Sequence, residues 1–258
     1  MLFCPATVHF QFRNLVLLAV SLPLFGFLFA ILWSILTAWE SSTHTHCHVA
    51  NILPSVSAAL GNSLQENVWQ WCVGLHVIPR CLMIWMYHKY LSQIIHQTLW
   101  LIVGLCGLLQ SLENFGLLGL TFAGSDDNYE MHRNFFILFI LCAEAYSIIL
   151  VVLLQAYRKL PATPLEEKSL FVKRVLIICN VFSLLCAMYT FARHNSLCEP
   201  GVYSLFALFE YIVILTNMGF HMTAYWDFRH AIITTGKQQV LYLTKQSKNV
   251  YLRNILIL

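Results

Sequence analysis

Six stretches of this sequence are long and apolar enough to cross a membrane, and they restrict the fold more than any other feature. A spanning helix needs roughly 20 apolar residues. The first stretch is too long for the apolar core of a signal peptide, which has about 7–15 residues, so we expect it to remain as a helix. Only 10% of the 258 residues are charged, against about a quarter in soluble proteins. We therefore predict an all-α integral membrane protein, a six-transmembrane helix bundle with helices at about 14–37, 67–90, 97–121, 134–157, 173–193 and 201–225.

The basic residues predict the orientation, because cytoplasmic loops carry an excess of Lys and Arg. Twelve of the 15 fall on the side of both termini, Arg133 and Arg193 fall on the other side, and Arg80 lies within a helix. We expect cytoplasmic termini and lumenal loops at 38–66, 122–133 and 194–200. The cytoplasmic stretch "RKLPATPLEEKS" is interpreted as a solvated connector. Residues 1–228 form the transmembrane domain, and 229–258 form a basic tail that is either an interfacial helix on anionic lipid or a partly disordered segment.

Six of the nine cysteines fall within predicted helices, where they are most simply small buried hydrophobic residues. Cys4 is cytoplasmic, and only Cys47 and Cys198 are lumenal. Two thiols alone in an oxidising compartment are expected to pair, so we predict a Cys47–Cys198 disulfide. The run T-H-T-H-C-H at 43–48 offers metal-ligating side chains in a spacing that matches no common zinc site. We predict no metal.

Ionisable side chains inside the predicted helices are costly in a bilayer and usually face a cavity or a partner. His76 and Arg80 are four residues apart and share one helix face, while Pro79 between them leaves a backbone carbonyl without its donor. Acidic groups on three other helices fall at a similar depth, which predicts a buried polar pocket. The alternative is that Arg80 only pairs with a glutamate and holds the bundle together. The polar positions are His76, Arg80, Gln110, Glu113, Asn114, Glu144, Asn180, Glu210, Asn217 and His221.

Three stretches carry a resemblance to a known family. They are "THCHVANILPSVSAALG", "WQWCVGLHVIPR" and "ARHNSLCEPGVYSLFALFEYIVILTNMGFHMTAYWDF". The sequence resembles the post-GPI-attachment-to-proteins factor 2 family of the wider Frag/DRAM/Sfk group over roughly residues 14–228. The cytoplasmic loop around Pro161 and the tail lie outside this resemblance, and Glu144 has no counterpart in it.

The resemblance implies a multi-pass protein of the Golgi membrane, with the endoplasmic reticulum as the alternative, that remodels the lipid of glycosylphosphatidylinositol (GPI) anchors. The implied reaction returns a saturated chain to the sn-2 position of a lyso-GPI-anchored protein, a step needed for stable surface display. Partners would be membrane lipid, GPI-anchored proteins and other GPI-remodelling enzymes, without nucleic acid. No bound cofactor is expected, and the acyl donor would be acyl-CoA or a phospholipid. We therefore expect an acyltransferase or transacylase.

Acylation of a hydroxyl requires a general base and a group that stabilises the oxyanion. We expect His76 or His194 as the base, oriented by Glu210 or Glu113. No serine lies in a nucleophile elbow, so direct transfer is expected rather than an acyl-enzyme. Substrate contacts are expected from Arg80, Arg193, Asn114, Asn217, His221 and His132. Two alternatives remain open: a non-catalytic adaptor that presents lyso-GPI to a separate acyltransferase, and a lipid transporter or scramblase.

Overall fold

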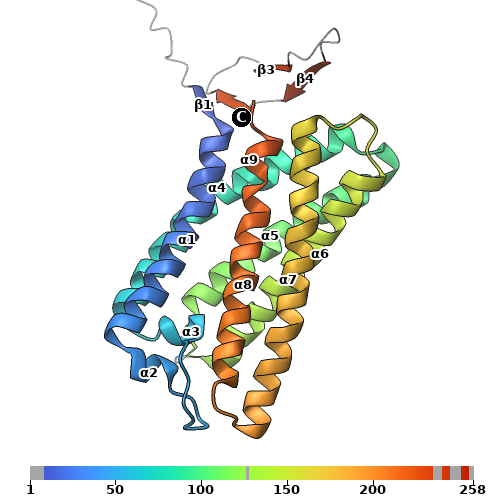
Figure 1. Ribbon diagram of the computed structural model, residues 1–258. Helices are drawn as coiled ribbons and strands as arrows, with labels where there is room; N and C mark the ends of the chain where they lie inside the picture. The colour runs from blue at the N-terminus through green and yellow to red at the C-terminus, as the bar shows by residue number, and fades with distance from the viewer. Residues whose placement is uncertain (1–8, 126–127, 235–239, 245–250, 256–258) are drawn as a thin grey trace, which may run out of the picture.

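A computed structural model describes residues 9–125, 128–234, 240–244 and 251–255. Its main feature is a bundle of six long helices, shown in Figure 1. They are α1 (Phe12–Thr37), α4 (Ser63–Ile94), α5 (Trp100–Phe122), α6 (Tyr129–Ala156), α7 (Pro164–Leu197) and α8 (Val202–Met222). The short helices are α2 (Trp39–Thr43), α3 (Val56–Ala59), the 3-10 turn η1 (Gln97–Leu99) and α9 (Ala224–Asp227). The all-helical prediction is confirmed for this bundle.

Five of the long helices are long and apolar enough to cross a membrane, namely α1, α5, α6, α7 and α8, with η1 extending α5 and α9 extending α8. The remaining long helix, α4, has 32 residues but carries Glu66, Arg80 and Lys89. Large apolar side chains cover the outside of the bundle, as at Ile78 and Ile178, each 70% exposed. Such a surface belongs in lipid rather than in water. The protein is therefore a multi-pass membrane protein.

Two helices, α4 and α7, extend beyond their predicted bounds at both ends. α4 begins at Ser63 and ends at Ile94, and it continues through Pro79 without interruption. α7 begins at Pro164, inside the stretch interpreted as a solvated connector. The reason is a capping box: the Thr163 side chain accepts from the Glu166 backbone N–H, and the Glu166 carboxylate accepts from the Thr163 backbone N–H.

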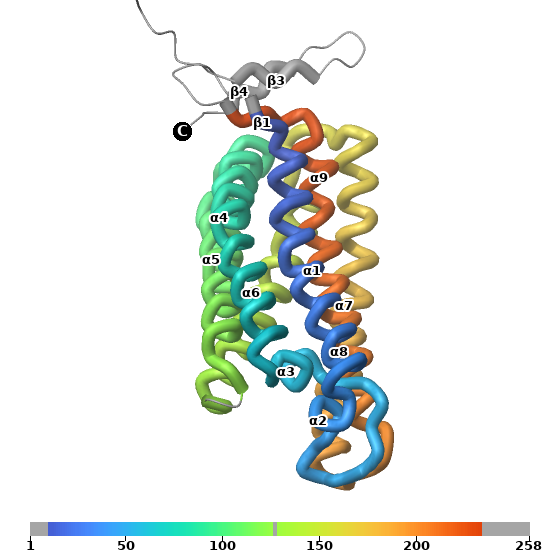
Figure 2. Tube along the Cα trace, turned by 90° about the vertical axis from the view of Figure 1, so that its left-hand side faces the viewer, coloured from blue at the N-terminus to red at the C-terminus, as the bar shows by residue number. Residues whose placement is uncertain are grey.

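The six long helices pack in a ring, in the order α1, α4, α5, α6, α7 and α8, and α8 returns to α1. Figure 2 shows α4 and α5 on the left of the bundle and α7 and α8 on the right. α5 and α6 approach closely because α5 places Gly116 against the backbone of Phe139. One hydrophobic cluster around Phe12, Tyr87 and Phe228 fills the end of the bundle that holds the termini. A smaller cluster around Phe27 and Trp69 lies toward the opposite end.

Both terminal segments lie at the same end of the bundle, here called the terminal end (Figure 1). The strand β1 (His9–Gln11) pairs antiparallel with β2 (Ile232–Thr234), and β3 (Val240–Thr244) pairs with β4 (Tyr251–Ile255). The described parts of the tail therefore contain strands, not the interfacial helix considered above. The loops that contain Cys47 and Cys198 lie at the opposite end, here called the disulfide end.

Candidate functional site

A cavity of about 280 Å³ lies among the helices and is lined by all six long helices together with α3. At the disulfide end its lining includes Gly61, Ser125 and His132, and at its inner end it reaches Arg80 and His221. Eight of the ten catalytic and substrate-binding candidates from the sequence line this one cavity. They are His76, Arg80, Glu113, Asn114, His132, Glu210, Asn217 and His221.

The inner end of the cavity holds a cluster of three ionisable side chains from three helices. Arg80 Nη2 on α4 lies 2.9 Å from Glu113 Oε2 on α5, and both residues are 2% exposed. His221 on α8 places Nε2 2.8 Å from Glu113 Oε1 and 2.7 Å from Arg80 Nη2. Asn217, one turn earlier on α8, donates to Glu113 Oε1 at 3.5 Å. Removing either partner of such a buried ion pair leaves an uncompensated charge.

His221 cannot satisfy both of its neighbours at the same time. A guanidinium only donates hydrogen bonds and a carboxylate only accepts them. His221 Nε2 therefore either accepts from Arg80 or donates to Glu113. The imidazole is also stacked on the ring of Tyr146, with centroids 6.0 Å apart. Whether Nε2 of His221 carries a hydrogen therefore determines which member of the Arg80–Glu113 ion pair it bonds.

One ring nitrogen of His76, Nε2, has no hydrogen-bond partner among the described residues. Its Nδ1 contacts the backbone carbonyl of Ala19 on α1, and a carbonyl oxygen only accepts, so Nδ1 carries the hydrogen. In the neutral imidazole Nε2 is then the acceptor. Since His76 lines the cavity, this nitrogen can accept a hydrogen bond or a proton from a bound hydroxyl group.

Two polar atoms of the cavity wall are buried without a partner among the described residues. They are Arg80 Nη1, a donor, and Asn114 Oδ1, an acceptor. A buried polar group without a partner costs about 1–3 kcal/mol. A ligand with an anionic oxygen and a hydroxyl group would satisfy both atoms.

Glu210 lies away from this inner cluster, toward the disulfide end. Its Oε2 accepts from the backbone N–H of Val56 at 2.9 Å, at the start of α3. No histidine in the described ranges hydrogen-bonds to Glu210, so the structure gives this carboxylate a different partner from the one expected. Arg80 pairs with Glu113 and not with Glu210.

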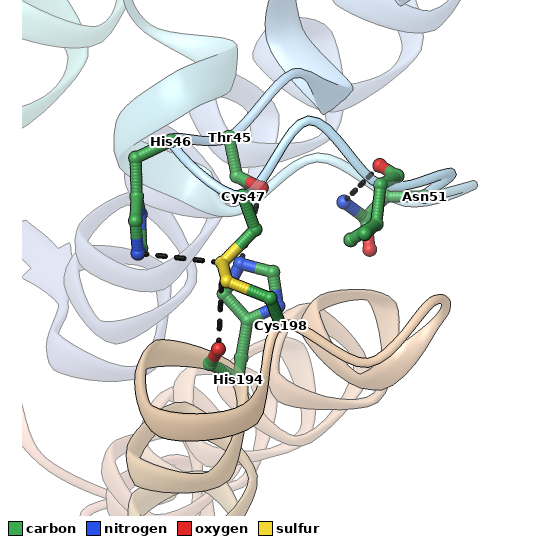
Figure 3. Close-up of a disulfide and its surroundings, with 7 residues drawn as sticks. Thr45, His46, Cys47, Asn51, His194 and Cys198 are labelled. Carbon is green, nitrogen blue, oxygen red and sulfur yellow. Dashed lines mark hydrogen bonds between the residues drawn. A yellow bond between two sulfur atoms is a disulfide. The ribbon is translucent and has the colours of Figure 1, made fainter.

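His194 and Arg193 are the two candidates that the structure does not bring into the cavity. His194 is fully buried behind the disulfide, with Nε2 3.1 Å from Thr45 Oγ1 (Figure 3). Arg193 points outward and donates twice to Glu199, from Nε at 2.6 Å and Nη2 at 2.9 Å. These hydrogen bonds lower the pKa of Glu199 below its ordinary value. Arg193 therefore already has an ionised carboxylate partner at neutral pH.

The predicted disulfide between Cys47 and Cys198 is confirmed (Figure 3). It joins the segment after α2 to the end of α7, across a sequence separation of 151 residues. Donor atoms of His46, Cys47 and His194 lie within 4.8 Å of one another. Because Cys47 is bonded to Cys198, its sulfur is not the thiolate that ligates zinc, and this cluster offers no complete metal site.

Fold and site together define the class: a multi-pass helical membrane protein with a largely apolar cavity among its helices and ionisable side chains at the inner end of that cavity. The family model described as "Frag1/DRAM/Sfk1/Cwh43P N-terminal domain" matches residues 11–231. The chain belongs to this family, and within it to the post-GPI attachment to proteins factor 2 group.

Relatives are similar along nearly the whole chain. "Post-GPI attachment to proteins factor 2" of Drosophila pseudoobscura pseudoobscura is 46% identical, over 93% of this chain and 96% of the relative. "Acyltransferase PGAP2" of Xenopus tropicalis is 41% identical, over 84% and 88%. "Post-GPI attachment to proteins factor 2" of Caenorhabditis elegans is 34% identical, over 87% and 89%. No solved structure matches the chain.

Proposed function

We propose that this protein remodels the lipid of GPI anchors by reacylating lyso-GPI-anchored proteins with a saturated chain at sn-2, and that the central cavity is the site. The relatives' names support GPI-anchor remodelling as the role and acyl transfer as the reaction class. The compartment would be the Golgi, with the endoplasmic reticulum as the alternative. Surface GPI-anchored proteins would depend on the reaction for stable display.

The proposed orientation places the terminal end in the cytoplasm and the disulfide end in the lumen, with α4 as a sixth span. Three observations support it. Most basic residues flank the terminal end. The β1–β2 pairing brings both terminal segments to one end, as an even number of spans requires. Cys47 and Cys198 pair at the other end, and disulfides persist in oxidising compartments.

The unpaired donor of Arg80 in the cavity is the observation that carries the proposal. Arg80 Nη1 has no hydrogen-bond partner in the described part of the chain, although Arg80 is 2% exposed. A phosphate oxygen of the anchor lipid would pair with this donor, and guanidinium groups bind phosphate well. The Nε2 atom of His76 and the Oδ1 atom of Asn114 would accept from hydroxyl groups of the same lipid.

The acyl donor would be a phospholipid or acyl-CoA. A lumenal acceptor and a cytoplasmic thioester lie on opposite sides of the membrane. Transfer from a phospholipid in the same leaflet keeps donor and acceptor together and needs no access from both sides. Other GPI-remodelling enzymes would supply the lyso-GPI substrate.

The test is mass spectrometry of the anchor lipid on a reporter protein. Cells that lack this gene would be rescued at matched expression with wild type, His76→Ala or Arg80→Lys. Arg80→Lys keeps the charge beside Glu113 but removes the second nitrogen of the fork. His88→Ala is the matched control for His76→Ala, because His88 is an exposed histidine of the same helix.

We expect wild type and His88→Ala to restore two-chain saturated anchors and the cavity variants to leave lyso-anchors. Anchors that are identical with and without the wild-type protein would reject the proposal and favour lipid transport. Lipid binding and acylation that are lost together in every cavity variant would favour the adaptor.

A further inference from the structure

Ser57 and His132 form a hydrogen-bonded pair in the wall of the cavity, near the disulfide end. Ser57 Oγ lies 3.0 Å from His132 Nε2. Ser57 belongs to α3 and His132 to the first turns of α6, so the pair forms only when these two elements meet. Both residues line the cavity and both are half-buried, which leaves the hydroxyl accessible to a bound lipid.

The backbone carbonyl of Ala123 determines which partner donates in the Ser57–His132 hydrogen bond. His132 Nδ1 lies 2.7 Å from the backbone carbonyl of Ala123. Because a carbonyl only accepts, Nδ1 carries the hydrogen, and Nε2 of the neutral imidazole is the acceptor. The Ser57 hydroxyl therefore donates to His132. A hydroxyl that donates to an imidazole, which is itself oriented by an acceptor, is the arrangement of an activated nucleophile.

Side chains of α8 hold the backbone segment that carries Ser57. Ser204 Oγ accepts from the backbone N–H groups of Ile52 and Leu53. Tyr211 donates to the carbonyl of Pro54, and Tyr203 donates to Ser55 Oγ at 2.8 Å. Glu210 then accepts from Val56 N–H, directly before Ser57.

These contacts fix a short loop segment against a rigid helix. In the part of the chain that the structure describes, the Ser57 side chain bonds to His132 and not to α8. Residues of α8 instead hold the five positions before Ser57. A catalytic side chain requires this kind of support, because small displacements of a nucleophile cost large factors in rate.

We propose that Ser57 is the nucleophile, and His132 the general base and acid, of a two-step acyl transfer through a Ser57 acyl ester. The inference rests on the proposed acyl transfer function and replaces the direct transfer expected from the sequence. The substrate class is a fatty acyl ester or thioester as donor, and a lysolipid hydroxyl as acceptor.

In the first step Ser57 Oγ attacks the carbonyl carbon of the donor, and its proton moves to His132 Nε2. The bond from that carbon to the donor's oxygen or sulfur breaks, and His132 returns the proton to the leaving group. In the second step the lysolipid hydroxyl attacks the Ser57 ester and gives its proton to His132. The bond to Ser57 Oγ breaks, and the proton returns to Ser57. No oxidant, reductant or metal is consumed.

The experiment looks for the acyl-enzyme directly. Purified full-length protein in lipid nanodiscs would receive an alkyne-tagged acyl chain, as phosphatidylcholine in one arm and as acyl-CoA in the other. Without acceptor, peptide mass spectrometry should find the chain on Ser57 in the arm with the true donor. Neutral hydroxylamine should leave this oxygen ester intact, which distinguishes it from acylated cysteine. Lysophosphatidylinositol added afterwards should discharge the chain.

Substitutions at Ser57 and His132 distinguish loss of the chemical step from loss of the folded site. Ser57→Ala should abolish the acyl-enzyme and slow acyl transfer at least about a hundredfold, and His132→Gln should slow both steps by a similar factor. Ser57→Cys should carry the chain as a thioester that hydroxylamine cleaves, which shows that the altered site still folds. Ser111→Ala is the matched control, because Ser111 is exposed and its hydroxyl donates to the carbonyl of Gly107 in its own helix.

Two results would overturn the assignment. One is Ser57→Ala protein that transfers acyl chains within threefold of wild type. The other is wild-type protein that turns over with no chain on Ser57 in either arm. Both leave the proposed function standing. Absence of remodelling by the wild-type protein in the reporter cells would instead remove the proposed function itself.

Discussion

Glu210 on α8 accepts a hydrogen bond from the backbone N–H of Val56, at a sequence separation of 154 residues. The contact ties the segment that carries Ser57 to the helix that also carries Asn217 and His221. One carboxylate at the disulfide end therefore supports the geometry of the cavity wall.

Replacement of Glu210 by Leu should loosen this segment. The buried Val56 N–H would lose its acceptor, at a cost of about 1–3 kcal/mol. Hydrogen–deuterium exchange of the peptide over residues 54–60 should rise, and anchor remodelling should fall. Glu210→Gln keeps an acceptor oxygen and should remain close to wild type. Equal exchange in the Leu variant and wild type would contradict this role.

The Arg80–Glu113 pair should show strong coupling in a double-mutant cycle. Glu113→Leu alone leaves the Arg80 charge buried without compensation and should cost about 3–5 kcal/mol of folding stability. The double variant Arg80→Met/Glu113→Leu should recover most of this loss, because neither charge remains. Equilibrium unfolding in detergent micelles measures both. Additive losses would show that the two side chains act independently.

Gly116 should tolerate no larger side chain. A Cβ atom there would lie 2.9 Å from the backbone nitrogen of Phe139, and the backbone cannot move aside without separating α5 from α6. Gly116→Ala should therefore destabilise the protein by about 1–3 kcal/mol. Gly104→Ala on the same helix meets nothing within 4 Å and should be neutral or slightly stabilising, because Ala favours helix over Gly. Thermal unfolding of both variants checks the contrast.

Loss of the disulfide should destabilise the disulfide end. Cys47→Ser/Cys198→Ser removes a cross-link between positions with a sequence separation of 151, and removing a native disulfide typically costs about 2–5 kcal/mol. The unfolding midpoint should fall, and reductant should no longer affect it. Cys81→Ser, at an exposed free cysteine, is the matched control. A wild-type midpoint that reductant does not change would contradict the prediction.

Several features of this structure could be predicted from the sequence because local physics determines them. Long apolar stretches predicted the positions of the six long helices, five of which are apolar enough to cross a membrane, since backbone groups in lipid must bond within their own segment. The cost of burying Arg80 predicted an acidic partner, which is Glu113. The disulfide followed because Cys47 and Cys198 are the two cysteines left on one side of the predicted helices.

Other features depend on docking that no local pattern encodes. Ser57 meets His132 because α3, which α8 holds in place, lies beside the first turns of α6 and so brings together residues 75 positions apart. His194 follows directly after Arg193, yet one is buried against Thr45 and the other faces outward. The start of α7 at Pro164 could have been predicted from the sequence, because Thr163 and Glu166 have the spacing of a capping box.

The support of residues 52–56 by α8 also sets an order of events during synthesis. Translation proceeds from the N-terminus, and Ser57 is made long before Ser204, Glu210 and Tyr211, which hold its segment in place. From the moment His132 is made until α8 is complete, the nascent chain thus carries both Ser57 and His132 without the framework that aligns them. A chain truncated before α8 would lack an aligned pair, so the proposed activity can begin only once the last long helix has entered the membrane.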